Sequence, residues 1–250
     1  MCQAVGKSPG VERGGIKVGS YPRMQVELLS HTPEPERVVA LAARLCYSPL
    51  TGKELKEEMT PSRVAGLLEK VLSMGHYSVL EHATFSFLIF GISRVTTHQL
   101  VRHRIGCSFS QKSQRYVREK EPHFVVPPGI GDNPEKSEEF IQFCRQSFAG
   151  YCQLVEQGVH QEQARYLLPQ ALESSIMVTM NGRALHHFFQ LRCCNRAQDE
   201  IRFMAEKMLA QVLEAAPLLF QKAGPACESG PCPEGDKSCG REKGDDFGND

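Results

Sequence analysis

The densest group of chemically capable side chains lies in one short stretch, RHRIGCSFSQKSQRYV, which spans residues 102–117. Its cationic and ionisable members are Arg102, His103, Arg104, Lys112 and Arg115, and serines and glutamines lie between them. Such a cluster is most often a solvated surface. Converging arginines can also bind one phosphate or carboxylate group through paired hydrogen bonds. The interspersed polar side chains favour this second interpretation, an anion site of fixed geometry.

Three more arginines lie at the edges of predicted helices, beside apolar residues that would cover their aliphatic stems. They are Arg165, Arg183 and Arg192. A buried arginine needs a partner that hydrogen-bonds its charge, and few carboxylates lie near these positions in the sequence. Any one of them could be an ordinary surface arginine. As a set they predict a phosphorylated small-molecule ligand.

The chain has 250 residues, of which 41% are hydrophobic, and a formal net charge of zero. This composition predicts one large folded domain and argues against non-specific nucleic-acid binding, which requires a basic surface. No apolar run is long enough for a transmembrane helix, and the first residues lack a secretion signal. We therefore expect a cytoplasmic protein without a membrane partner. Its ten cysteines are expected to be reduced thiols or metal ligands.

Hydrophobic periodicity predicts helices and strands from residue 24 to residue 216. Strands are expected at 24–32, 83–95, 123–126 and 173–180, and helices at 34–47, 60–76, 94–104, 136–158, 160–168, 181–194 and 197–216. Thr60 and Asn181 have side chains typical of helix N-caps. Strands scattered among more numerous helices indicate an α+β fold, with a mixed or antiparallel sheet packed against several helices in a single domain.

Three segments are expected along the chain. Residues 1–23 are Gly-rich and form a flexible extension or precede the natural start, residues 24–223 form the domain, and residues 224–250 form a Cys/Gly/Pro-rich tail. The tail residues Cys227, Cys232 and Cys239 could join Cys193 or Cys194 in a zinc or iron–sulfur site. A disordered tail with spare thiols is the alternative, and the sequence leaves the metal question open.

Two other motifs have a weaker chemical interpretation. His76 and His82 lie six positions apart in GHYSVLEH, which is not metal spacing on a helix, so His82 is expected in the core or in a supporting role. Cys107 lies among cations that would lower the pKa of its thiol, which would allow a thiolate nucleophile. The sequence contains no Walker-type loop, no Gly-x-Gly-x-x-Gly after a strand and no Gly-x-Ser-x-Gly motif.

The same stretch resembles the signature of the flavin-dependent thymidylate synthases, in which Arg-His-Arg is followed after seven residues by Ser-x-Arg-Tyr. Further similar segments follow the family's order: AARLCY (42–47), GHYSVLEHATFSF (75–87), QLVRHR (99–104), SQKSQRY (110–116), ARYLLP (164–169), NGRALHHFFQLR (181–192) and AQDEI (197–201). Together they cover the chain from Met24 to Ala216. Here eight residues separate Arg104 from Ser113, and the extra one is expected at Gly106 or Cys107, where a glycine can form a bulge.

The resemblance implies an enzyme that makes dTMP from dUMP. The implied carbon donor is 5,10-methylenetetrahydrofolate, and FAD reduced by NADPH is the implied hydride carrier. Because no cysteine attacks the uracil in this family, the implied catalytic residue is Arg192, which favours the ionised N3 of uracil. The family's homotetramers also imply self-association, with each site built from several chains and occupied by small molecules.

The residues carried over from the family fall into two sets. The implied dUMP contacts are Gln99, Leu100, Val101, Arg102, Gln111, Lys112, Ser113, Gln114, Arg115, Arg165 and Arg192. Among them, Arg115 and Arg165 would clamp the phosphate and the base, and Ser113 would position the substrate. The implied FAD contacts are His76, Ser78, Glu81, Arg102, His103, Arg104, Gln111, Asn181, Gly182, Arg183 and His187. His187 stands where the family often has Asn.

A rival hypothesis is a nucleotide- or RNA-binding module without catalysis, in which Phe109 and Tyr116 would stack on a base. The neutral chain lacks the broad basic face that such modules present. Flavin absorbance in the purified protein would discriminate between the two hypotheses.

Overall fold

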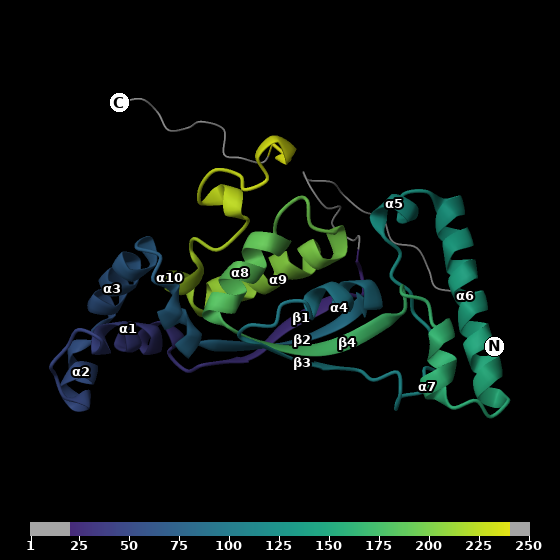
Figure 1. Ribbon diagram of the computed structural model, residues 1–250, viewed down its shortest axis with the longest axis horizontal. Helices are drawn as coiled ribbons and strands as arrows, with labels where there is room; N and C mark the ends of the chain where they lie inside the picture. Colours follow the sequence, from purple (N-terminus) through teal and green to yellow (C-terminus); the bar gives the residue numbers. More distant parts are fainter. Residues whose placement is uncertain (1–20, 241–250) are drawn as a thin grey trace.

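The computed structural model describes residues 21–240, and they have the predicted α+β fold (Figure 1). Four strands form one antiparallel sheet in the order β1-β2-β4-β3. Their bounds are β1 Gln25–His31, β2 Thr84–Ser93, β3 Cys107–Gln111 and β4 Glu173–Asn181. No helix among the described residues combines the length and apolar character needed to cross a membrane.

The two central strands, β2 and β4, supply the middle of the core. Alternate residues on each strand point to the same face, and the buried cross-strand pairs are Phe85–Met180, Phe87–Val178 and Ile89–Ile176. Helices α8 (Gly182–Arg192) and α9 (Asp199–Ala215) cover this face. The other face has no helix over it in the described chain (Figure 1), and there the hydroxyls of Ser86 and Thr179 hydrogen-bond at 2.8 Å.

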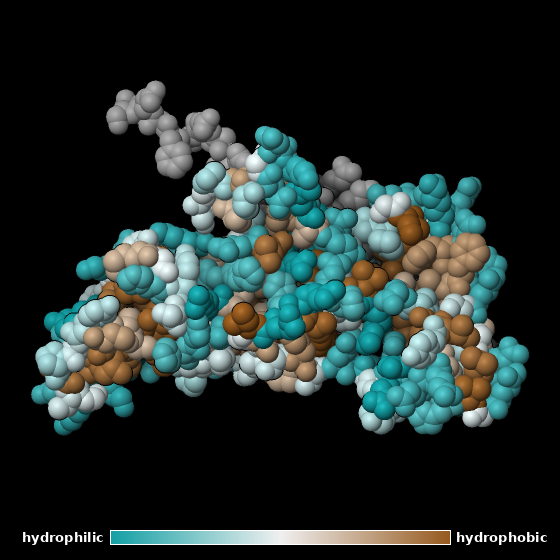
Figure 2. Space-filling view, viewed as in Figure 1, coloured by the Kyte–Doolittle hydropathy of each residue, from teal (hydrophilic) through white to brown (hydrophobic). Residues whose placement is uncertain are grey.

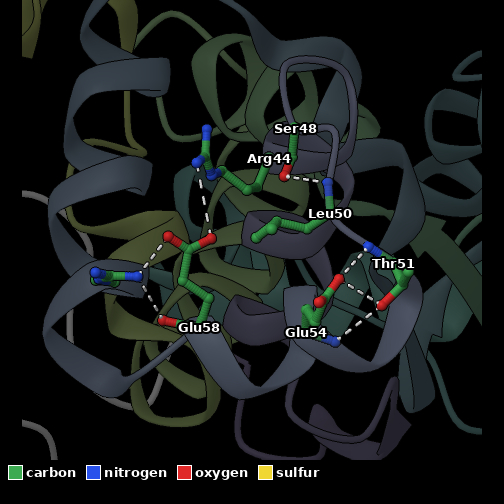
Figure 3. A network of polar contacts seen from close by, with 7 residues as sticks. Arg44, Ser48, Leu50, Thr51, Glu54 and Glu58 are labelled. Atoms are coloured by element: carbon green, nitrogen blue, oxygen red, sulfur yellow. Dashed lines mark hydrogen bonds and ion pairs between the residues drawn. The ribbon is translucent and has the colours of Figure 1, made fainter.

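Three helices gather at one end of the sheet: α1 (Pro35–Leu45), α2 (Gly52–Glu58) and α3 (Pro61–Ser73). The Glu58 carboxylate joins them, because it pairs with Arg63 at 2.5 Å and with Arg44 at 3.7 Å (Figure 3). Helix α2 was not predicted from the sequence. Its signal is the capping box Thr51-x-x-Glu54, in which side chain and backbone hydrogen-bond reciprocally.

The opposite end carries a helical hairpin with its own small apolar cluster. Its elements are α5 (Pro128–Gly131), α6 (Pro134–Glu156), α7 (Gln161–Ala164) and the 3-10 turn η2 (Arg165–Leu167). Phe148, Tyr151 and Ala164 form the buried centre of the cluster. The strand predicted at 123–126 was wrong: only a single bridge joins Phe124 to Leu172. Two prolines follow directly, and proline cannot donate to a strand ladder.

The segment from α4 to residue 117, which contains the cationic stretch 102–117, has more regular structure than predicted. Helix α4 (Arg94–Leu100) ends before the arginines, so the prediction of a helix to residue 104 was too long. The predicted loop contains β3, whose side chains alternate between partly buried and exposed positions. Gly106 precedes β3 with a φ of 71°, a backbone conformation that favours glycine. The alternation of serines with Cys107 and Phe109 was the signal for this strand.

Both predicted termini needed correction. Tyr21 is buried against Phe203, so the folded part includes at least the last residues of the predicted N-terminal extension. After α10 (Pro217–Phe220), the predicted tail continues through two 3-10 turns, η3 (Ala226–Glu228) and η4 (Gly235–Lys237). Residues 1–20 and 241–250 lie outside the described part. Figure 2 shows hydrophobic surface over both helical ends. Leu45 at one end and Phe143 at the other are exposed apolar side chains.

Candidate active site

The start of α8 is fixed against the loop before β3 and against the 3-10 turn η1 (Tyr77–His82). The Asn181 side chain accepts a hydrogen bond from the Ala184 N–H at 2.8 Å and caps the helix, as predicted. The Asn181 N–H donates to the Gly106 carbonyl at 2.9 Å. A Cβ on Gly182 would lie 2.9 Å from the Leu80 carbonyl oxygen, so this close approach requires glycine. The motifs that contain Asn181, Gly182 and Gly106 therefore meet.

The remaining residues of this region surround that junction. The Arg183 guanidinium pairs with the Glu81 carboxylate at 2.7 Å and thereby joins α8 to η1. His76 and Ser78 are exposed at the beginning of η1. His82 is exposed as well, so its predicted core placement was wrong. The His187 ring lies 6.0 Å from the His103 ring, centroid to centroid.

Arg192, the last residue of α8, is held by an imidazole. Its Nε–H donates to Nε2 of His103 at 3.0 Å, which requires that nitrogen to be unprotonated. His103 is 9% exposed, and burial lowers its pKa to about 4, with smaller contributions from Arg192 and His187. His103 is thus neutral at neutral pH. The contact orients Arg192 without cancelling its positive charge.

We call Asn181, Arg183, Glu81, His103 and Arg192 the α8 group. A second set of polar contacts lies at β3 and the segment after it. We call its ionic members, Lys112, Arg115, Glu119, Glu162 and Arg165, the β3 group.

The β3 group pairs its cations with carboxylates. The Lys112 ammonium donates to Glu119 at 2.7 Å, and the Arg115 Nε lies 2.6 Å from a Glu162 carboxylate oxygen. This pairing raises the pKa of Arg115. Arg165 Nε donates to the Glu162 backbone carbonyl at 3.2 Å, so one residue contacts both arginines. Among Arg165, Arg183 and Arg192, for which few carboxylates lie nearby in the sequence, only Arg183 has a carboxylate partner within residues 21–240, and that partner, Glu81, is 102 positions away.

Amide side chains connect α4 to its neighbours. Gln99 Nε2 donates to Gln198 Oε1 at 2.8 Å, and Gln111 Nε2 donates to the hydroxyls of Thr97 and Ser174. Because these contacts use the Nε2 groups of Gln99 and Gln111 as donors, the Oε1 atoms of both amides remain available to accept from a ligand. Gln198, which lies in the motif AQDEI, and Glu162 are functional candidates that the sequence analysis missed. The signal for Glu162 was its position three residues before Arg165.

The other predicted residues differ in their accessibility. Arg102 and Arg104 are exposed, whereas Arg165 and Arg192 are half-buried, and no carboxylate within residues 21–240 forms an ion pair with any of the four. Ser113 and Gln114 are half-buried, and the Ser113 hydroxyl accepts from the Arg115 N–H at 3.2 Å. Val101 is half-buried, and Leu100 is fully buried, so Leu100 could offer a ligand only its backbone.

One chain does not bring all these residues into a single contact network. In the described residues, no hydrogen bond or ion pair joins a member of the β3 group to a member of the α8 group. A cavity of about 540 Å³ lies where β4 begins, and Lys112 contributes to its wall together with Glu119, Glu121 and Glu173. Its mixed charges do not make it a dedicated anion pocket. Arg102, Arg115, Arg165 and Arg192 are not among its lining residues.

The structure does not support two hypotheses about cysteines: a thiolate nucleophile at Cys107 and a metal site formed by the tail cysteines. Burial raises the pKa of the Cys107 thiol, whereas the sequence analysis expected nearby cations to lower it. No group of three or more His, Cys, Asp or Glu side chains within residues 21–240 could hold a metal ion. The proposed four-thiolate site of Cys227, Cys232 and Cys239 with Cys193 or Cys194 is therefore not formed.

Comparison with known proteins identifies the family. The family model for thymidylate synthase complementing protein (Thy1) matches residues 27–218. A flavin-dependent thymidylate synthase from Geobacter sulfurreducens is 52% identical over 220 residues, which cover 87% of this chain and 94% of the relative. A flavin-dependent thymidylate synthase from Clostridium tetani is 42% identical over 234 residues, with the same coverage of 87% and 94%.

A solved structure has the same fold. It is a UMP/dUMP methylase from Streptomyces cacaoi bound with 5-Br dUMP, with a TM-score of 0.70 and 27% sequence identity. The similarity covers 79% of this chain and 93% of that one. The motif series, the fold and these matches agree, and the chain belongs to the flavin-dependent thymidylate synthase family.

Proposed function

We propose that this enzyme methylates dUMP to dTMP, with 5,10-methylenetetrahydrofolate as the carbon donor and FAD reduced by NADPH as the hydride carrier. The names of the relatives and of the structural neighbour support the reaction and the flavin. The observation that carries the proposal is the contact between Arg192 and the neutral His103. It presents an oriented cation whose charge no carboxylate of the described chain cancels.

Arg192 is the proposed catalytic residue. A fixed guanidinium beside the uracil stabilises negative charge that develops on the ring when N3 is ionised, and this makes C5 more nucleophilic. The arrangement needs no thiolate, in agreement with the raised pKa of Cys107. His103 orients Arg192 and accepts one of its hydrogen bonds, which leaves the terminal Nη groups available for the substrate.

For dUMP itself, we propose that Arg115 and Arg165 clamp the phosphate and base. Glu162 holds both of them through its side chain and backbone, and a phosphate can replace a surface carboxylate at little cost. The other proposed contacts are Gln99, Leu100, Val101, Arg102, Gln111, Lys112, Ser113, Gln114 and Arg192.

The residues carried over for FAD fit a flavin dinucleotide. Arg102 and Arg104 are exposed, and no carboxylate within residues 21–240 pairs with them, which suits binding to a diphosphate. The close packing of Gly182 and Gly106 around Asn181 gives the adjoining backbone a fixed shape. When bound, reduced FAD supplies the hydride. The proposed FAD contacts are His76, Ser78, Glu81, Arg102, His103, Arg104, Gln111, Asn181, Gly182, Arg183 and His187.

We further propose that the enzyme is a homotetramer whose sites are completed by neighbouring subunits. Large apolar side chains beside the arginines are exposed in the single chain, with Ile105 at 93%, Tyr166 at 86% and Tyr116 at 75%. Subunit contacts would cover such side chains. Light scattering on the purified protein tests this directly, and a monomeric mass with full activity would contradict it.

The first experiment is an absorbance spectrum of the purified protein, followed by an assay of NADPH oxidation and dTMP formation. We expect flavin bands, and NADPH oxidation coupled to dTMP only when dUMP and methylenetetrahydrofolate are both present. RNA binding by a colourless protein without dTMP formation would instead support the non-catalytic alternative.

A further inference from the structure

The chain continues beyond residue 218, where the family match ends, and folds back toward the end of α8. In Figure 1 this part, coloured yellow, rises beside α8. Its base is fixed in the core: Phe220 is fully buried against Phe85, and the Leu219 carbonyl contacts the His186 ring at 2.8 Å. Gly224 and Pro225 are also buried. We call residues 224–240 the C-terminal clasp.

The far end of the clasp is held by Arg196, which lies in the connection between α8 and α9. Arg196 Nη1 donates to the Lys237 backbone carbonyl at 2.6 Å, and its Nε lies 3.5 Å from a Glu234 carboxylate oxygen. Lys237 ends the 3-10 turn η4, so the guanidinium contacts an ordered turn. Arg196 thus contacts a residue, Lys237, that lies 41 positions away in the sequence.

The same connection is held from within the fold by Arg202 of α9. Arg202 is buried and donates to the side chains of Asn195 at 2.9 Å and Asp199 at 2.8 Å. Cys193, directly after Arg192, is 2% exposed. The connection is therefore fixed on its inner side by Arg202 and on its outer side by the clasp.

We infer that the C-terminal clasp positions the catalytic arginine, with Arg196 as the positioning residue; this inference rests on the role proposed for Arg192. Arg192 is the last residue of α8, so its guanidinium depends on how the following connection is held. Its contact with His103 has a length of 3.0 Å, which leaves little tolerance for movement. Displacement of a reacting group by about 1 Å can cost up to about a hundredfold in rate.

Two changes to the enzyme test the inference: Arg196→Ala, and a stop codon after Ser229 that removes most of the clasp. Because the contacts are partly exposed, we expect each change to lower kcat for dTMP formation about three- to tenfold. FAD content should stay unchanged, since the proposed flavin contacts are elsewhere. The combined variant should lose no more than either alone, because both changes remove the same contact. Arg196→Lys, which can still donate to the Lys237 carbonyl, should retain most of the activity.

Matched controls separate this effect from general destabilisation. Arg63→Ala removes an exposed arginine that likewise contacts a carboxylate and a backbone carbonyl, both of Glu58 (Figure 3). A stop codon after Gly240 leaves the clasp intact. Neither control should change kcat. Unchanged kcat in both Arg196→Ala and the Ser229 truncation, or additive losses in the combined variant, would overturn the inference.

Hydrogen exchange gives a readout that does not depend on catalysis. Amides of residues 193–198 should exchange faster in the FAD-loaded Arg196→Ala enzyme than in the wild type, and equal rates would also overturn the inference. Wild-type enzyme that makes no dTMP would contradict the proposed function instead, while the exchange result would still decide whether the clasp orders this connection.

Discussion

The two arginine groups of this enzyme are held by opposite means. In the α8 group, Arg192 donates to the neutral imidazole of His103, and no carboxylate of the described residues compensates its charge. In the β3 group, Arg115 lies against the Glu162 carboxylate, and both side chains are nearly half exposed. In the proposed function, the first arrangement leaves the charge of Arg192 available for catalysis, whereas the second holds Arg115 against a carboxylate that the substrate phosphate would replace. The difference teaches that the partner of an arginine, more than its burial, determines its use.

The largest effect is expected from Arg192→Ala. Loss of one preorganised charge beside the reacting ring typically costs about a hundredfold or more in rate, so dTMP formation should nearly vanish while FAD stays bound. Single-turnover assays and the flavin spectrum measure the two properties. Near-normal turnover would show that Arg192 does not stabilise the developing charge.

Arg115→Ala should act on substrate binding rather than on the chemical step. A charge-assisted contact to phosphate contributes strongly to binding, so we expect the KM for dUMP to rise about tenfold or more with a smaller change in kcat. Steady-state kinetics separate the two constants. A fall in kcat with an unchanged KM would place Arg115 with Arg192 and remove the contrast between the groups.

Acid should weaken the α8 group selectively. His103 has a pKa of about 4 in the fold against an ordinary value of 6.5, so the unfolded chain binds its proton first as the pH falls. The contribution of His103 to folding stability is therefore fully present above pH 6.5 and is lost progressively down to pH 4, by about 3 kcal/mol.

Thermal unfolding of the wild type and of His103→Gln between these pH values measures this loss. The glutamine oxygen can still accept from Arg192 but does not titrate in this range. We expect a smaller decline with pH in the variant. Parallel declines in the two proteins would mean that His103 does not carry the effect.

Glu162→Gln is expected to change the KM for dUMP less than Arg115→Ala does, and in the opposite direction. Without the carboxylate, Arg115 keeps an uncompensated charge, and the KM for dUMP should fall about two- to fivefold. The effect should shrink at high salt, because exposed charges are screened. A raised KM would mean that Glu162 mainly orients Arg115 and does not compete with the phosphate.

The smallest effect is expected from Cys107→Ala. Burial raises the pKa of this thiol, so it is protonated at neutral pH, and dTMP formation should stay within about twofold of wild type. Mass spectrometry should detect no dUMP adduct on Cys107. An inactive but folded, FAD-containing variant would restore the nucleophile hypothesis.

Local signals predicted much of the fold correctly. Thr60 and Pro61 mark the start of α3, although the Thr60 side chain makes no capping hydrogen bond to the helix. Gly75 follows the end of α3 with a φ of 73°, and Asn181 caps α8. The alternation from Thr84 to Phe90 predicted the buried face of β2, which includes Phe85 and Phe87. These features depend only on residues that are neighbours in the sequence, so they can be predicted from one sequence alone.

Helix α2 and strand β3 had local signals that were overlooked, whereas the missed contacts around the candidate site join distant residues. Gln99 and Gln198 lie 99 positions apart, and Arg115 meets Glu162 only after the helical hairpin has folded. The C-terminal clasp shows no hydrophobic periodicity, because it has no amphipathic face. Its position is fixed by the contact with Arg196 and by the burial of Gly224 and Pro225. The family resemblance supplied the residues of the site, but not the partners that hold them.

The order of the strands also determines when this enzyme can begin to work during its synthesis. The Thr32–Thr84 contact next to the β1–β2 pair spans 52 positions, the Gln111–Ser174 contact between β3 and β4 spans 63, and the Ser86–Thr179 contact between β2 and β4 spans 93. Such long loops must close before the contacts can stabilise anything, which slows folding. The central pair of strands cannot form until β4 has left the ribosome. A nascent chain that stalls before β4 therefore exposes the apolar face of β2, and would depend on chaperones to avoid aggregation.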